Sequence, residues 1–429
     1  MKNIFIKNTI ILIIGGFITK ILSMLIKIII TRNISENAMS LYMLTIPSYN
    51  LFITIVSSGF GITISKLISE NKINKKKLMS TAFIISTIIS FSLVILIIVF
   101  SKYICILLHN KDLYYPLIST ILSLPFIGIS SILKGYFLGK NKMHINVISN
   151  LIEQIIRIII FMTILNKIDN DILACTFIIG SNIINEIISV IILSIFLPKT
   201  NINKKNIITY DKEIKKEILS ISIPTTTSRL IGTLSYFFEP IILTNLLILN
   251  GYSNNYIKLE YGILTGYSMQ LLLLPSFFSM AISQSIIPII SNAYINKRYS
   301  YIKKKVKSIL LLSLIIGITY ISIILINPNI FLKLIYNTNK GVDYIKVMAP
   351  IFILLYIQTP ITAILQSINL SRVTMKSTIC GTGIKILLII ILSFCNIGIY
   401  SYIIPILINI IFVTTNNYLI LKKKLSNLS

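Results

Sequence analysis

Two oppositely charged residues, Glu153 and Arg157, lie four positions apart in an apolar stretch about long enough to cross a bilayer. On a helix, residues at this spacing share one face, so the sequence predicts an ion pair inside the membrane. Charge is costly to bury in a hydrophobic span, and it therefore marks a candidate functional site. We expect this pair to act as a gate or as a structural clamp.

Further charges occur in or at the ends of the other apolar stretches, and positive charge dominates. The basic residues are Lys20, Lys27, Lys66, Lys134, Arg157, Arg229 and Lys385, and the acidic residues are Glu153, Glu186 and Glu239. Such an excess around a shared cavity would suit an anionic ligand, such as a phosphate or diphosphate headgroup. Lys20 and Lys27 are separated by nearly two helical turns and so share a face.

We predict that Lys20, Lys27 and Arg229 bind the headgroup. Lys20 lies near the middle of its helix, whereas Lys27 could also extend toward the membrane surface. Alternative interpretations apply to several of the other charges. Lys66, Lys134 and Lys385 could anchor helix ends at the membrane surface, as long basic side chains do. Glu186 suits packing against a polar partner better than carrying protons.

The composition indicates an all-α integral membrane protein. Of 429 residues, 55% are hydrophobic and 12% are charged, and the mean hydropathy is +0.87. The net charge of +27 does not indicate nucleic-acid binding, because the bases lie in short loops between apolar segments. The cysteines lack metal-site spacing, and we expect no metal and no cofactor. We also expect no enzymatic activity, because no phosphate-binding motif or loop large enough for a catalytic module occurs.

The apolar stretches predict about twelve transmembrane helices in two six-helix bundles. The first bundle covers 1–197, a cytoplasmic linker covers 198–217, and the second bundle covers 218–429. The expected helices lie near 10–31, 41–67, 79–101, 114–138, 144–165, 172–197, 218–249, 260–291, 307–326, 346–368, 377–395 and 398–421. Sparse matches between 44–65 and 264–285 suggest a parallel internal repeat, an arrangement that suits alternating access.

The basic residues of the loops predict the orientation in the membrane. One set of alternate loops and termini carries 25 lysines and arginines, and the other set carries 8. Because cytoplasmic loops are enriched in these residues, both termini are expected in the cytoplasm of a multi-pass cell-membrane protein.

Three stretches carry a resemblance to a known family. They are KGYFLGKNKMHINVISNLIEQIIR at 134–157, YFFEPIILTNLL at 236–247 and YGILTGYSMQLLLLPSFF at 261–278. Together with TKILSMLIKIIITRNI at 19–34, they resemble the stage V sporulation protein B family of the MATE-like (MOP) flippase superfamily. The resemblance implies that basic residues of the first helix face a central cavity. Many relatives carry two more helices, often linked to a groove for the lipid tail, whereas this sequence stops at Ser429.

The residues and the resemblance together predict a flippase for a polyprenyl-diphosphate-linked saccharide, a peptidoglycan or polysaccharide precursor. A role in spore cortex synthesis is implied by the resemblance alone. The expected partners are this anionic precursor and membrane lipids. The alternative is a cation-coupled multidrug or small-molecule exporter of the same fold, in which transport would depend on the acidic residues.

Overall fold

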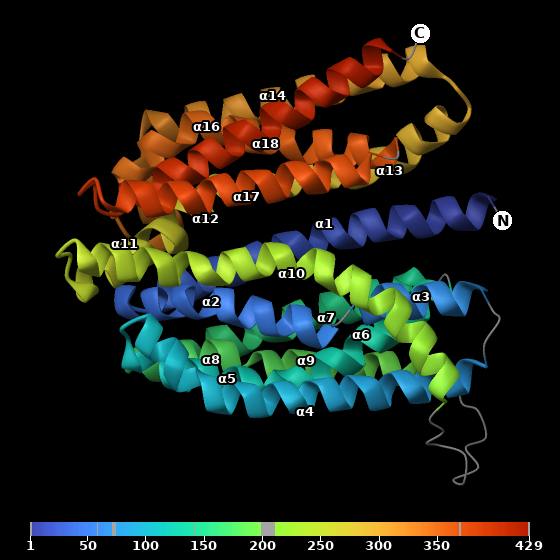
Figure 1. The fold of residues 1–429 in the computed structure, drawn as a ribbon, viewed down its shortest axis with the longest axis horizontal. Coiled ribbons are helices and arrows are strands. Elements are labelled where there is room, and N and C mark those ends of the chain that lie inside the picture. The colour runs from blue at the N-terminus through green and yellow to red at the C-terminus, as the bar shows by residue number, and fades with distance from the viewer. Residues whose placement is uncertain are drawn as a thin grey trace. The chain divides into compact units, whose positions relative to one another are not determined.

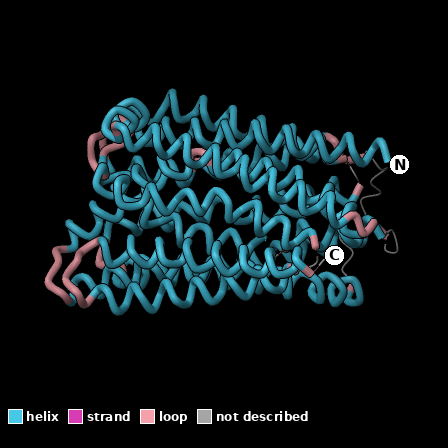
Figure 2. The backbone as a smooth tube through the Cα atoms, turned by 90° about the horizontal axis from the view of Figure 1, so that it is seen from above, coloured by secondary structure: helices cyan, strands magenta, loops and turns pink. Residues whose placement is uncertain are grey.

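The computed structural model describes residues 2–57, 59–70, 74–140, 142–198, 211–368 and 370–427, and within these ranges every regular element is a helix. The chain forms two compact units, Met1–Pro240 and Ile241–Ser429. In each unit, long helices run side by side and the loops gather at the helix ends (Figures 1 and 2). The unit boundary lies within a helix, later than the expected 198–217 linker, of which 199–210 fall outside the described residues.

The first unit contains nine long or medium helices, counted over the described residues, and three short turns. They are α1 (Lys2–Asn33), α2 (Glu36–Ser57), α3 (Phe60–Glu70), α4 (Lys75–Leu107), η1 (Lys111–Leu113), α5 (Tyr114–Ser119), η2 (Thr120–Ser123), α6 (Leu124–Gly139), α7 (Met143–Ile164), η3 (Leu165–Lys167), α8 (Asp171–Gly180) and α9 (Asn182–Ile195). Helix α10 (Lys212–Leu249) continues from this unit into the second. It begins six residues before the expected start at 218, because the Asp211 carboxylate accepts hydrogen bonds from the first free backbone amides.

The second unit holds the remaining helices. They are α11 (Asn254–Ile263), the π-helical turn η5 (Leu264–Ser268), α12 (Met269–Leu273), α13 (Ser276–Ile295), α14 (Tyr299–Ile326), α15 (Pro328–Tyr336), α16 (Val342–Ser367), α17 (Ser371–Ser393) and α18 (Tyr400–Ser426). In Figure 1, α14, α16 and α18 lie along one another in this unit, and their packing surrounds a buried aliphatic cluster that includes Val306, Ile361 and Leu421.

Eleven helical segments of the described residues are long and apolar enough to cross a membrane. Residues 260–291, the remaining expected span, are divided into α11, η5, α12 and α13. The π turn and Pro275, which has no backbone N–H to donate, account for this division. The large apolar side chains exposed along the spans, such as Phe91 and Ile95 of α4, are suited to contact with lipid.

Other expected helices are also interrupted. The expected 41–67 helix divides into α2 and α3 near Gly59, which has a φ of +62° that glycine adopts without strain. The expected 172–197 helix divides into α8 and α9 next to Gly180. Both pairs of helices still form single membrane-spanning stretches, Glu36–Glu70 and Asp171–Ile195, as the sequence pattern indicates.

Contacts between loops show which helix ends lie together within each unit. In the first unit, Lys77 forms an ion pair with Asp211 at 3.8 Å, and a hydrogen bond with Lys75 lowers the pKa of Lys140. These residues belong to loops that the sequence assigns to one side of the membrane. In the second unit, the Asn250 side-chain amide, just after α10, donates to the Ser393 carbonyl at the end of α17 at 3.0 Å, and both helix ends are assigned to the opposite side.

Close packing of α3 against α6 depends on Gly135, and this gives a test of the fold. A Cβ atom at Gly135 would lie 2.7 Å from the backbone oxygen of Gly61. Gly135→Ala should therefore lower the free energy of unfolding by about 1–3 kcal/mol, as overpacking does. Gly232→Ala is the matched control, because a Cβ there meets no atom within 4 Å. Thermal unfolding in detergent measures both, and equal destabilisation by the two variants would contradict the packing.

Candidate functional site

A buried polar network joins three helices of the first unit. Helix α6 contributes Ser130 and Lys134, helix α7 contributes Asn146, Ser149 and Glu153, and helix α9 contributes Glu186 and Ser189. On each helix the network residues recur three or four positions apart, so each helix presents a polar stripe to its neighbours. Glu153, Glu186 and Lys134 of this network are evident from the sequence as intramembrane charges, whereas its serines and Asn146 are not.

Glu153 lies at the centre of the network and is almost fully buried. Its Oε1 atom lies 3.3 Å from the Lys134 Nζ atom and accepts a hydrogen bond from the Ser149 Oγ atom at 2.9 Å. Ser149 lies 3.1 Å from Ser189 of α9, which extends the contact to a third helix. The carboxylate is thus compensated by a cation and a hydroxyl, as a buried charge requires.

Glu186 is held in a similar way on α9. Its Oε2 atom accepts a hydrogen bond from the Ser130 Oγ atom at 2.5 Å, and both Lys134 and Glu153 are close enough to influence it electrostatically. The polar partner expected for Glu186 is therefore present. Lys134 pairs with Glu153 and is part of the network, although the sequence also allowed it a role as a surface anchor.

Arg157 does not pair with Glu153 in the structure. Its guanidinium carbon lies 5.3 Å from the centre of the Phe161 ring, and its Nε atom is buried without a hydrogen-bond partner. Two tyrosines of α2, Tyr42 and Tyr49, lie within its electrostatic reach. The four-residue spacing placed Glu153 and Arg157 on one face, but Lys134 from α6 occupies the position beside the carboxylate.

Helix α1 carries the two predicted headgroup lysines. The Lys20 side chain is exposed, Lys27 has an exposed side but is largely surrounded by protein, and the two are close enough to repel each other. Helix α1 packs against α7, where Gly15 contacts Val147 and the Ser23 Oγ atom donates to Gln154 at 3.4 Å. The lysines therefore belong to the helix that packs directly against the one carrying Glu153.

Arg229 and Glu239 both lie on α10 but are separated by ten residues, or about 15 Å along a helix. Arg229 is exposed, whereas Glu239 is buried and accepts a hydrogen bond from the Ser235 Oγ atom at 3.4 Å. Lys385 is half-buried on α17 and belongs to the second unit. Within the described part of the chain, no group of three His, Cys, Asp or Glu residues is arranged to hold a metal ion.

Comparisons with known proteins identify the fold from a solved structure and the family from sequence matches. The chain resembles the solved structure of an inward-facing multidrug resistance MATE family transporter of the MOP superfamily, with a TM-score of 0.75 and 13% identity over 95% of each chain. The fold is therefore that of MATE-like transporters. The model of the MatE family matches residues 265–391, and that of the polysaccharide biosynthesis protein family matches residues 5–294.

The chain belongs to the polysaccharide biosynthesis protein family. It is 32% identical to stage V sporulation protein B of Bacillus subtilis over 91% of this chain and 78% of that protein. It is also 24% identical to the lipid II flippase MurJ of the same organism over 90% of this chain and 77% of that protein. The predicted resemblance to the stage V sporulation protein B family is confirmed.

The observed contacts predict that Glu153 is energetically coupled to Lys134 more strongly than to Arg157. Glu153→Gln and Lys134→Gln should each lower the free energy of unfolding. The double variant should lower it by less than the sum of the two single effects. We expect a coupling energy of about 1–3 kcal/mol. Thermal unfolding of both single variants and the double variant measures it. The same cycle with Arg157→Gln is the control, and stronger coupling in that cycle would contradict the observed pairing.

Proposed function

We propose that the chain moves a polyprenyl-diphosphate-linked saccharide, a peptidoglycan or polysaccharide precursor, across the cytoplasmic membrane by alternating access. Membership of the polysaccharide biosynthesis family is the observation that carries the proposal, and similarity to a lipid II flippase supports it. Similarity to stage V sporulation protein B favours a role for this transport in spore cortex synthesis.

The distribution of charge in the spans supports an anionic substrate. All three intramembrane acids accept hydrogen bonds from serine side chains, and Glu153 also pairs with a lysine. The basic residues Lys20 and Arg229 are instead exposed on their helices, and Lys27 is partly exposed. Exposed bases in a water-accessible cavity would attract a diphosphate, while the lipid tail of the precursor remains in the bilayer.

The membrane potential would assist this transport. Outward movement of each net negative charge is favoured by about 2.3 kcal/mol per 100 mV when the cell interior is negative. The protein bases remain in place, so the charge that crosses the membrane is that of the substrate. A few separated bases, rather than one tight cluster, allow the headgroup to be released outside.

A cation-coupled exporter is the second candidate. The two buried acids Glu153 and Glu186, which lie in one polar network of α6, α7 and α9, are the observation that favours it, because acidic residues inside a membrane bundle mark ion pathways in transporters. In that case, efflux would depend on these acids and survive the loss of Lys20 and Arg229.

Charge reversal of the exposed bases tests the flippase proposal. In proteoliposomes with an imposed potential, Lys20→Glu and Arg229→Glu should reduce precursor flipping to background, because repulsion replaces attraction in a low dielectric. Lys385→Glu, in the other unit, should have a milder effect. Unchanged flipping in both reversals, with no response to potential, would remove the basis for an anionic substrate.

The proposed orientation places both termini in the cytoplasm, and cysteine labelling tests it. In a background without the four native cysteines, single cysteines at Lys111, Lys167 and Asp343 should react with an impermeant thiol reagent in intact cells. Cysteines at Lys76 and Lys304 should react only after lysis. All five side chains are exposed in the structure, so burial would not explain a missing reaction. The reverse pattern would invert the proposed topology.

A further inference from the structure

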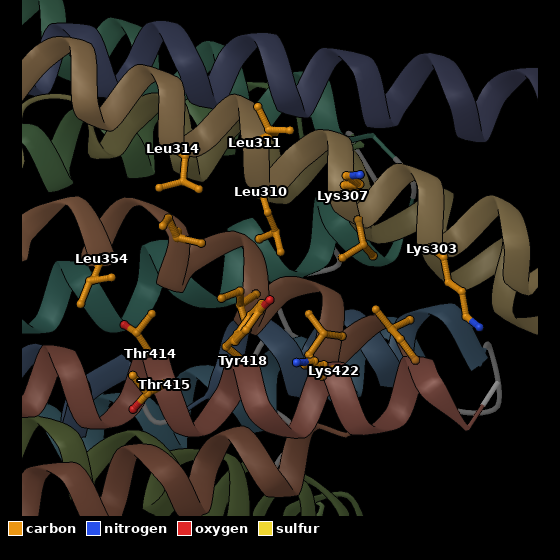
Figure 3. A pocket seen from close by; sticks show the side chains of 15 residues that line it. Lys303, Lys307, Leu310, Leu311, Leu314, Leu354, Thr414, Thr415, Tyr418 and Lys422 are labelled. Carbon is orange, nitrogen blue, oxygen red and sulfur yellow. The ribbon is translucent and has the colours of Figure 1, made fainter.

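A lysine-capped apolar groove lies in the second unit. Helices α14, α16 and α18 line a cavity of about 600 Å³. Figure 3 shows Lys303, Lys307 and Lys422 toward one end, and Leu314, Leu354 and Thr414 toward the other. We call this cavity the α14–α18 groove.

The lysines of the groove have no acidic counterpart on the helices that form it. Helices α14 and α18 contain no Asp or Glu, and the only acid of α16 is Asp343, at its first turn. Asp343 precedes the groove-lining part of α16, which begins at Leu354, by about three helical turns. Three exposed cations at one end of an apolar channel therefore create a positive potential that attracts an anion.

The rest of the groove is suited to hydrocarbon. Its walls are mainly leucine, isoleucine and valine, and the hydroxyl of Thr414 donates to the Gln358 Oε1 atom at 3.3 Å. Leu311 and Tyr418, on opposite walls, are each nearly half exposed, so the groove opens to the surface of the unit. A ligand with an anionic end and an apolar chain matches both parts.

We propose that the α14–α18 groove binds one anionic phospholipid, whose phosphate contacts Lys303, Lys307 and Lys422 and one of whose acyl chains lies along the leucines. The cavity volume falls in the range of pockets that bury a small ligand, which suits one acyl chain better than a protein segment. With the proposed orientation, the lysines lie at the cytoplasmic leaflet, where anionic lipids are concentrated. This binding does not depend on the identity of the transported substrate.

The absence of tryptophan from the sequence makes a direct measurement possible. Tyr418→Trp places a single fluorophore in the groove, and Phe91→Trp places one on the exposed face of α4. Each variant is reconstituted in phosphatidylcholine vesicles that contain increasing fractions of phosphatidylglycerol with brominated chains. Brominated phosphatidylcholine is the neutral reference quencher. The tryptophan at 418 should be quenched several-fold more efficiently by the anionic lipid, whereas the tryptophan at 91 should show no preference.

Two sets of lysine substitutions separate binding in the groove from general attraction to a basic surface. The preference for anionic over neutral lipid at position 418 should disappear in a triple variant that carries Lys303→Gln, Lys307→Gln and Lys422→Gln. The control triple variant removes the same charge from neighbouring lysines that do not line the groove, and carries Lys304→Gln, Lys305→Gln and Lys423→Gln. The preference for anionic lipid should be largely unchanged in this control.

Three outcomes would overturn the proposal. Equal quenching of the tryptophan at 418 by anionic and neutral lipids would show that the groove does not select a headgroup. Equal loss of the preference in both lysine sets would assign it to the surface charge as a whole. Protection from quenching that rises with the protein-to-lipid ratio would show that a second copy of the chain covers the groove.

Discussion

The cost of holding ionised side chains in a hydrocarbon environment is the constraint on which this structure depends. In the first unit, each buried carboxylate has a nearby partner that lowers this cost. Glu153 forms an ion pair with Lys134 and accepts a hydrogen bond from Ser149, and Glu186 accepts a hydrogen bond from Ser130. The compensating groups come from α6, α7 and α9, so the polar network also fixes how these helices pack. Removing one partner would leave a buried charge alone, which is more costly than removing both.

The helices can reach these partners because small residues let them approach closely. Gly135 of α6 lies against Gly61 of α3, and Gly139 of α6 lies against Ser65 of α3. In lipid, close packing of this kind replaces the hydrophobic effect as a source of helix association. The same helix, α6, thus combines a packing face with the polar stripe that carries Lys134.

Much of this architecture could be predicted from the sequence, because long apolar runs and lysine-rich loops are local signals. The ion-pair partner of Glu153 could not be predicted from the sequence. Its spacing from Arg157 defines a shared face, but the choice of Lys134 depends on how α6 packs against α7, which no local pattern contains. The π turn at 264–268 was missed for the same reason, since the Ser268 hydroxyl donates to the distant Gly341 carbonyl. The break near Gly59 depends on a left-handed backbone conformation at that glycine. The headgroup roles of Lys20 and Arg229 remain predictions.

The most direct measurement of the proposed function is the identity and leaflet of lipid-linked saccharides in cells that lack this gene. If the protein is a flippase, a polyprenyl-linked saccharide should accumulate in the inner leaflet, and the intact gene should reverse the accumulation. An unchanged pool, together with reduced efflux of a cationic compound, would contradict the flippase proposal and support the exporter.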